Sequence, residues 1–104
     1  MNKIFIHGRL TREPELRYTS TGKSVASFSV AVNRRHGEKK ADFFDCEAWN
    51  GTADIASRYL HTGSEVAICG AMHSEQYEAK DGSKRRSWRL NVEEIEFCGK
   101  APEN

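Results

Sequence analysis

The stretch from Asp42 to His61, DFFDCEAWNGTADIASRYLH, changes its hydrophobic period in the middle. Residues 42–49 alternate, as expected of a β-strand whose successive side chains point to opposite faces. One face carries Phe44, Cys46 and Ala48, and the other carries Phe43, Asp45, Glu47 and Trp49. The first face is predicted to line a core, so the two aromatic rings of the second face are predicted to be exposed.

After this strand the apolar side chains recur at the spacing of one face of an α-helix, at Ile55, Ala56, Tyr59 and Leu60. The pattern predicts a short helix at about 52–61. We expect Asn50 to cap its N-terminus, Asp54 to lie in its first turn and Gly63 to follow its end.

The flanking segments are predicted to be further strands, at residues 3–10, 24–34, 65–77 and 85–97, with turn residues between them. The order is therefore three strands, one helix and two strands. An all-β OB-fold has this order: a five-stranded antiparallel Greek-key barrel with a helix between its third and fourth strands. A β-sandwich has no place for the helix, so we predict the OB-fold.

The chain has 104 residues, which is the size of one domain. We expect the domain at residues 1–99 and a short flexible C-terminus at 100–104. No apolar run approaches the length that spans a bilayer, and the N-terminus lacks a signal-peptide pattern. The three cysteines are an odd number without a close pair, so free thiols in a reducing cytoplasm are expected.

The net charge of +1 conceals a strong segregation of charge along the chain. Residues 1–40 hold nine basic and three acidic side chains, whereas residues 41–79 hold one basic and seven acidic side chains. Residues 80–90 are basic again. If folding brings the two basic blocks together, they could bind nucleic acid. The alternative is that blocks of opposite sign simply pair across the sheet.

The sequence contains no pattern that predicts an enzyme. The four histidines are scattered, the cysteines lie at no metal-ligand spacing, and no phosphate-binding or nucleophile motif is present. Asp42 and Asp45 are three residues apart on a strand, so they point to opposite faces and form no carboxylate pair. We therefore expect no catalytic activity, no metal and no cofactor.

Aromatic residues accompany the basic segments. Tyr77 and Trp88 flank the basic loop 78–87, and several basic side chains surround His36 in another loop. Rings among lysines and arginines on a barrel suit single-stranded nucleic acid, because bases stack on the rings while the cations contact phosphates. The alternative is ordinary cross-strand packing of aromatic residues beside solvated hairpin tips.

Several motifs give the chain a resemblance to a known family. The specific ones are PELRY at residues 14–18 and VASFSVAVNR at residues 25–34, supported by GRLT at 8–11 and AW at 48–49. With these motifs the chain resembles the bacterial and phage single-stranded DNA-binding proteins over residues 1–98. The resemblance implies an OB-fold and a homo-oligomer, with a tetramer favoured and a dimer possible. It also implies sequence-independent coating of single-stranded DNA in the cytoplasm during replication, recombination or repair.

The resemblance also implies roles for individual residues. The base-stacking rings of the family fall on Phe43, Trp49 and Tyr77, and a fourth position falls on His36. Trp88 joins this set because of its place beside the basic loop. The phosphate contacts would be made by Lys3, Arg9, Arg34, Arg35, Lys84, Arg85 and Arg86. The first strand makes subunit contacts in the family, so Phe5 and His7 could be interfacial instead.

The chain departs from the family pattern at Asp45 and Glu47, which lie between two of the expected stacking rings. Two carboxylates beside a phosphate track would weaken binding unless they are neutralised. Our hypothesis is that arginines on neighbouring strands neutralise them. Glu47→Gln should then change DNA affinity little.

A second departure is the C-terminus, which ends at Asn104 without the acidic tail of the cellular members. We therefore expect no recruitment of tail-dependent replication and repair partners. A short adaptor similar to the primosomal replication protein N, with secondary DNA binding, is the alternative function. RNA binding by the same barrel also remains open, because no residue is an evident reader of the 2′-hydroxyl group.

Overall fold

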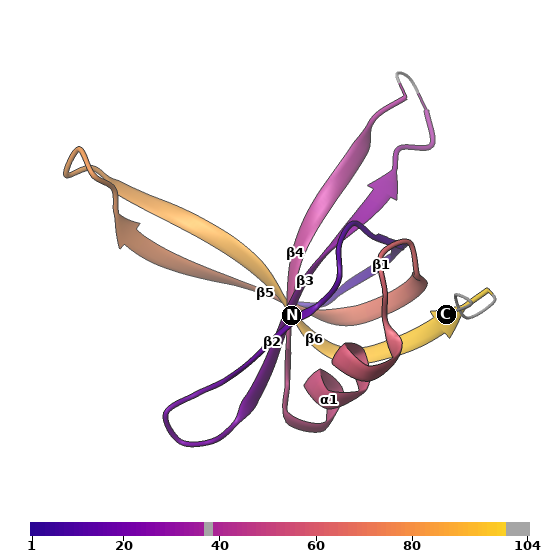
Figure 1. Cartoon of the computed structure of the whole chain (residues 1–104). Coiled ribbons are helices and arrows are strands. Elements are labelled where there is room, and N and C mark those ends of the chain that lie inside the picture. Colours follow the sequence, from indigo (N-terminus) through magenta and orange to yellow (C-terminus); the bar gives the residue numbers. More distant parts are fainter. Residues whose placement is uncertain (37–38, 100–104) are drawn as a thin grey trace.

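The computed structural model describes residues 1–36 and 39–99. Its elements are β1 (Ile4–Leu10), β2 (Glu15–Tyr18), β3 (Ser24–Asn33), β4 (Ala41–Trp49), α1 (Asn50–Tyr59), β5 (Glu65–Glu78) and β6 (Lys84–Cys98), shown in Figure 1. All five predicted strands and the predicted helix are present. The expected C-terminal segment 100–104 lies outside the described residues. Within the described part of the chain, no helix is long and apolar enough to cross a membrane.

The strands form one sheet in the order β1-β5-β6-β4-β3-β2, and an additional pairing of β1 with β3 closes it into a barrel. This closed sheet, with the one helix of the described residues, confirms the predicted OB-fold. Two details differ from the prediction. The short strand β2 was not predicted, and it pairs with β3. Strands β4 and β6 run parallel rather than antiparallel, and they are paired only at Cys46↔Leu90 and Glu47↔Asn91.

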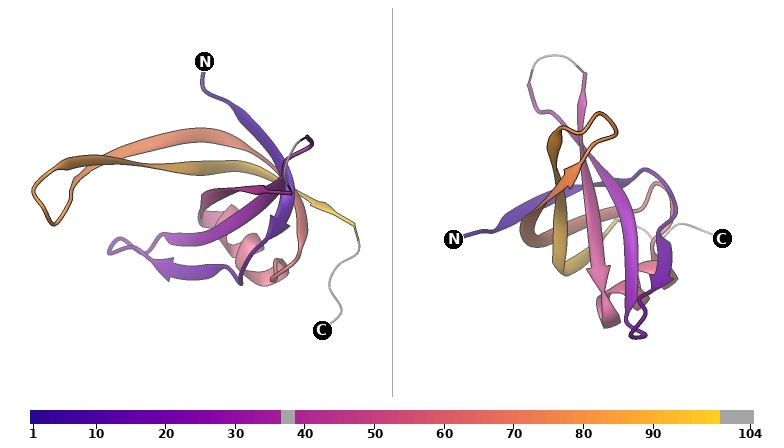
Figure 2. Two further views of the ribbon diagram at one scale, coloured as in Figure 1. Left: turned by 90° about the horizontal axis from the view of Figure 1, so that it is seen from above. Right: turned by 90° about the vertical axis from the view of Figure 1, so that its left-hand side faces the viewer.

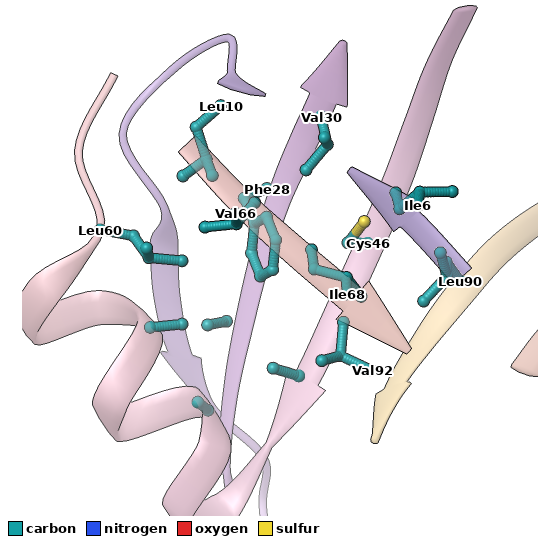
Figure 3. Close-up of a cluster of buried hydrophobic side chains, with 14 residues drawn as sticks. Ile6, Leu10, Phe28, Val30, Cys46, Leu60, Val66, Ile68, Leu90 and Val92 are labelled. Atoms are coloured by element: carbon teal, nitrogen blue, oxygen red, sulfur yellow. The ribbon is translucent and has the colours of Figure 1, made fainter. Parts of the chain in front are cut away.

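The inward side chains of the barrel form the core, together with Ala53, Ala56 and Leu60 from α1 and its end (Figure 3). Phe28 fills the centre and is 1% exposed. Cys46 is buried as the alternation of residues 42–49 predicted, and burial raises the pKa of its thiol to about 12. Cys69 and Cys98 are half-buried free thiols on the outer side of the sheet.

Two glycines allow neighbouring strands to approach where the barrel bends. A Cβ atom added to Gly8 would lie 2.2 Å from the carbonyl oxygen of Ala31, at the seam between β1 and β3. A Cβ atom added to Gly70 would lie 2.1 Å from the carbonyl oxygen of Asn91. Beside Gly70 the register shifts, because Cys69 pairs with Glu94 and Gly70 with Val92. Glycine at these positions removes a steric clash that any other residue would introduce.

The helix begins slightly earlier than predicted, and its capping was predicted wrongly. Asn50 is the first helical residue, with a left-handed φ of 54°, and it does not cap the helix through its side chain. The N-cap position of the helix is Trp49, which makes no side-chain capping bond, and no acidic residue lies in the first turn of the helix. The carbonyl of Asn50 instead accepts a hydrogen bond from the Ser24 hydroxyl. Gly63 lies past the helix end in the turn before β5, with φ 86°.

Two hairpins, which we call the arms, extend beyond the barrel. One consists of β3 and β4, and the other of β5 and β6 (Figures 1 and 2). Strands β4 and β6 are paired at Cys46 and Leu90 but separate from there toward the two hairpin tips, so the arms diverge. We call this point of separation the fork. The β5–β6 arm ends in a tight turn with Gly82 at φ 84°, where Ser83 donates two hydrogen bonds to Asp81.

On the barrel, Glu13 joins the loop after β1 to the turn before β5. Its carboxylate accepts hydrogen bonds from the Thr62 backbone N–H and from the Thr62 hydroxyl at 2.8 Å, and it lies 2.9 Å from Nδ1 of His61. The backbone bond from Thr62 is the largest cause of a lowered pKa, which is about 2 for Glu13. The contact therefore stabilises the ionised form of Glu13.

Candidate nucleic-acid interface

The outer face of β4 carries the side chains that strand alternation placed there. Phe43 is 67% exposed and Trp49 is 37% exposed, so both rings are accessible as predicted. They are six residues apart on one strand, which corresponds to roughly 20 Å at about 3.3 Å per residue. Asp45 and Glu47 lie between them on the same face. Two rings at this separation can contact different bases of an extended strand.

Glu47 has the arginine partners that the sequence hypothesis required. Oε2 of Glu47 accepts a hydrogen bond from Arg89 at 2.9 Å and another from Arg17 at 3.3 Å. Arg89 also contacts Glu75 at 3.2 Å, and Arg17 donates to the Ser27 hydroxyl at 2.6 Å. The Glu47 carboxylate, whose side chain is 14% exposed, raises the pKa of Arg89. The Glu47 carboxylate is therefore neutralised by arginines from two strands, β2 and β6.

Asp45 is compensated only at longer range. Among the described residues, no cation lies within ion-pair distance of its carboxylate, and its side chain makes no hydrogen bond. Arg89 nevertheless attracts Asp45, whose charge contributes to the raised pKa of Arg89. Arg17 and Arg89 direct their hydrogen bonds to Glu47 instead. The hypothesis of arginine partners therefore holds for Glu47 through direct bonds and for Asp45 only through this weaker attraction.

Two hollows adjoin this face. The first is lined by Trp49 together with Glu47, His73, Glu75, Arg89 and Asn91. The second lies at the fork and brings Trp88 and Asp45 together with Arg12, Arg17 and Arg89. The first hollow places His73 beside Trp49, a neighbourhood that sequence reasoning did not assign. Trp88 borders the second hollow from the face of β6 that Leu90 shares, opposite to the face of Arg89.

The β5–β6 arm carries the rest of the predicted set. Tyr77 is 49% exposed and Trp88 is 55% exposed. Tyr77 pairs with Arg85, while Trp88 pairs with Ser74, so the two rings lie on opposite faces of the arm. Arg86 donates to the Ser74 hydroxyl at 3.0 Å. Within the described residues, Lys84 makes no side-chain hydrogen bond or ion pair.

The β3–β4 arm places Arg34, Arg35 and His36 near its tip, and all three are exposed. Two guanidinium nitrogens of Arg34, Nε and Nη2, donate hydrogen bonds to the Asp42 carboxylate. The shortest of these distances is 2.9 Å, between Nη2 and Oδ1. This bond lowers the pKa of Asp42. Arg34 is therefore held in place by a neighbouring carboxylate.

The two residues near β1 that were predicted to contact phosphates form ion pairs with carboxylates. Lys3 pairs with Glu93, the extra residue at the register shift in β6. Arg9 lies 3.4 Å from Glu65 and donates to the Gly63 carbonyl at 3.0 Å. Arg9 pairs with Ala31, which in turn pairs with Phe43, so it lies two strands away from that ring. Lys3 lies at the other end of β1.

Sequence reasoning missed Arg12, Arg17 and Arg89 as site residues. Arg12 and Arg17 are in or near β2, which was not predicted, so their position was not defined. Arg89 could have been found, because the Asp81–Gly82 turn fixes the register of the hairpin that places it opposite His73. In the described part of the chain, no cluster of three or more His, Cys, Asp or Glu side chains could hold a metal ion.

Comparisons with known proteins point to one family. Residues 1–98 match the single-strand binding protein family. A single-stranded DNA-binding protein of Bacillus cereus is 38% identical over 101 residues, which cover 93% of this chain and 59% of that protein. Single-stranded DNA-binding protein 3 of Clostridium acetobutylicum is 39% identical and is covered to 70%. A single-stranded DNA-binding protein of Clostridium perfringens is 39% identical and is covered to 65%.

The chain thus spans about three-fifths of the length of the first of these relatives. The match nevertheless includes every strand and the helix, from the start of β1 to the end of β6. The barrel, its two arms and the exposed rings of β4 all lie within the matched region. The chain belongs to the single-strand binding protein family.

Proposed function

We propose that this chain binds single-stranded DNA without reading a defined sequence, and that it serves replication, recombination or repair in the cytoplasm. The observation that carries the proposal is the outer face of β4, where Phe43 and Trp49 are exposed and Glu47 is neutralised by two arginines. A polyanion could not follow this face if both intervening carboxylates were uncompensated.

Stacking of bases on exposed rings would supply most of the contact energy, at about 1–3 kcal/mol per base. Phe43 and Trp49 would hold bases along β4, and Tyr77, Trp88 and His36 would extend the path onto the arms. Because every base has a π-face, such a path tolerates any sequence. No chemical step is part of this function.

Phosphates would be contacted by basic side chains on and around the arms. Lys84, Arg85 and Arg86 form the densest group, and Arg34 and Arg35 occupy the other arm. Lys3 and Arg9 could contribute only by exchanging a carboxylate partner for a phosphate. Release of counterions from the DNA would make the affinity depend on salt.

We also propose that the chain works as a homo-oligomer, with a tetramer favoured over a dimer. Phe5 is 75% exposed on the outer face of β1, in a shallow apolar hollow with Ala67 and Cys69. A second copy would cover this ring, which a monomer leaves in water. Sedimentation velocity of the free protein distinguishes monomer, dimer and tetramer.

The test of DNA binding is a fluorescence titration of the two tryptophans with oligo(dT), repeated over a series of salt concentrations. We expect strong quenching and an affinity that falls as salt rises. Phe43→Leu should weaken binding about tenfold or more, by removing one stacking ring. The matched control is Phe97→Leu, because Phe97 is 53% exposed but packs on Tyr59, away from β4. Equal affinities for the two variants, or no binding at low salt, would overturn the proposal.

A further inference from the structure

The β5–β6 arm has two faces, and each face carries an exposed ring. Side chains that are directly opposite each other across the two strands share a face. Tyr77 pairs with Arg85, whereas Trp88 pairs with Ser74, so the two rings point to opposite sides of the arm. A DNA strand that lies along one side of the arm therefore cannot stack on both rings.

The two faces continue different parts of the barrel. Arg89 shares the face of Tyr77 and donates to Glu47, so this face continues the outer face of β4, and we call it the outer face of the arm. Leu90 shares the face of Trp88 and is fully buried in the core, so we call that side the inner face of the arm. Between the core and the tip, the inner face exposes one ring and two basic side chains from β6: Lys84, Arg86 and Trp88.

The arginines of the outer face of the arm already have carboxylate partners. Arg89 contacts both Glu47 and Glu75. Arg85 lies 3.8 Å from Asp81 in the turn. A phosphate group on this face has to compete with these carboxylates for the two guanidinium groups.

The cations of the inner face have no such competition. Arg86 donates to the neutral hydroxyl of Ser74, and within the described residues Lys84 makes no side-chain hydrogen bond or ion pair. Glu78 is opposite Lys84 across the arm, but no ion pair joins these two side chains. The inner face therefore combines an exposed indole with two available positive charges, which are the features that bind single-stranded nucleic acid.

The hollow at the fork connects the two faces. From Leu90 toward the tip, β6 is no longer paired with β4 and the arms diverge, so this edge of β6 is open (Figure 1). Trp88 lines the hollow from the inner face, and Arg89 lines it from the outer face. The hollow thus spans the open edge of the strand.

The charges around this hollow suit the passage of a phosphate backbone. It is lined by three arginines and two carboxylates, so it carries a net positive charge. Arg89 and Arg17 bind Glu47, whereas within the described part of the chain Arg12 makes no side-chain hydrogen bond or ion pair. Arg12 is therefore available to a phosphate at the crossing.

We propose that the inner face of the arm is a second contact surface for single-stranded DNA. The bound strand runs along the outer face of β4, crosses the edge of β6 at the fork and stacks a base on Trp88. Lys84 and Arg86 contact its phosphates beyond that base. The inference rests on the proposed function and adds a dependence on length, because a strand too short to cross the edge reaches one face only.

The test compares oligo(dT) of about 5 and about 16 nucleotides, near the two ends of the range that one OB-fold contacts. For Trp88→Ala, we expect the ratio of the long-strand to the short-strand association constant to fall at least about fivefold, the low end for one stacked base. The matched control is Tyr77→Ala, which removes a ring from the outer face and should weaken both lengths by the same factor. Anisotropy of labelled oligonucleotides at one salt concentration reports binding without relying on the indoles.

Two neighbouring arginines give the same comparison through charge. Arg85 and Arg86 are adjacent on β6 but lie on opposite faces of the arm. Arg86→Ala should reduce the slope of log K against log salt by about 0.7 for the long strand only. Arg85→Ala should reduce it for both lengths.

Fluorescence places the base directly. Because the chain has two tryptophans, Trp49→Phe leaves Trp88 as the sole indole and keeps a ring on β4. At one strand per chain, the long oligonucleotide should quench Trp88 strongly and the short one should not. Quenching of Trp88 that is equal at both lengths, or absent in a bound complex, would contradict the crossing.

The outcomes separate this inference from the function on which it rests. If the unmodified chain binds neither length, the proposed function fails and the inference fails with it. If both lengths bind and Trp88→Ala weakens them equally or not at all, the second surface is wrong while the proposed function stands. If Trp88→Ala instead changes the oligomeric state of the free protein in sedimentation velocity, the inner face contacts a second copy of the chain and the inference is again wrong.

Discussion

The barrel and the arms are made of the same strands but hold together differently. Within the barrel, β5 and β6 bury one side, with Ile68 and Leu90 almost fully enclosed. Beyond the fork, nearly all side chains of the same two strands are accessible, as at Tyr77 and Trp88. The arm is held by its backbone ladder and cross-strand pairs rather than by a core. Its side chains are consequently available to a ligand, whereas those inside the barrel are committed to packing.

This difference predicts that changes inside the barrel alter stability, and that changes on the arms alter binding. The largest effect is expected for Phe28→Ala, because Phe28 is 1% exposed at the centre of the core. The free energy of unfolding should fall by about 3–5 kcal/mol, measured by denaturant titration. Phe28→Leu, which fills more of the cavity, should lose less. A loss below about 1 kcal/mol for the alanine variant would contradict the assignment of Phe28 to a packed core.

Tyr77→Ala on the β5–β6 arm should do the opposite. Removal of one exposed stacking ring is expected to cost about 1–3 kcal/mol of binding free energy to oligo(dT), measured by fluorescence titration. The free energy of unfolding should change by less than about 0.5 kcal/mol. Tyr77→Phe keeps the ring and should restore binding. A stability loss as large as the binding loss would erase the distinction between the barrel and the arm.

Neutralising the basic tip sharpens the same distinction through salt. The combined change of Lys84, Arg85 and Arg86 to alanine should reduce the slope of log K against log salt by about two, at about 0.7 per single-strand phosphate contact. The same three changes should leave the unfolding transition in place. As a control, three substitutions of uncharged residues on α1 remove no phosphate contact, so they should leave the slope unchanged. An unchanged slope in the triple variant would place the phosphates elsewhere.

The smallest effect concerns pH and belongs to the barrel. Glu13 has a pKa of about 2 in the folded chain, below its usual value, because Thr62 and His61 bind its carboxylate. A lowered folded pKa stabilises the fold above the usual pKa and loses that contribution as pH falls toward 2. Between pH 5 and 2, the unmodified chain should therefore lose stability more steeply than Glu13→Gln, in parallel thermal scans. Coincident pH profiles would show that protonation of Glu13 is not coupled to the stability of the fold.

The sequence predicts the barrel well, because alternation has a meaning wherever one face is buried. It assigned Cys46 inward and Phe43 outward, and both assignments are confirmed. Strand β2 escaped prediction because all four of its side chains are exposed, so it shows no alternation. The start of α1 at Asn50 was predicted wrongly, because Asn50 is itself the first helical residue, with a left-handed φ, and Trp49 occupies the N-cap position without a side-chain bond.

The site could be predicted only in part, and Asp45 and Glu47 show why. Both are acidic and both are on the outer face of β4, but among the described residues only Glu47 forms ion pairs with arginines. What separates them is the direction of the Arg17 and Arg89 side chains, which both donate hydrogen bonds to Glu47. A spacing of two residues along one strand does not contain that information. The choice depends on a parallel pairing between strands that are distant in the sequence.

The pairing of β1 has a consequence for the order in which the chain can fold. Ile4 pairs with Gly70, and Arg9 pairs with Glu65, so the first strand has its main partner far along the chain. On a ribosome the barrel cannot close until β5 has emerged, and until then β1 can pair only with β3, at Arg9 and Leu10. Joining such distant strands costs conformational entropy before their contacts stabilise the chain, which is typical of slowly folding β-barrels.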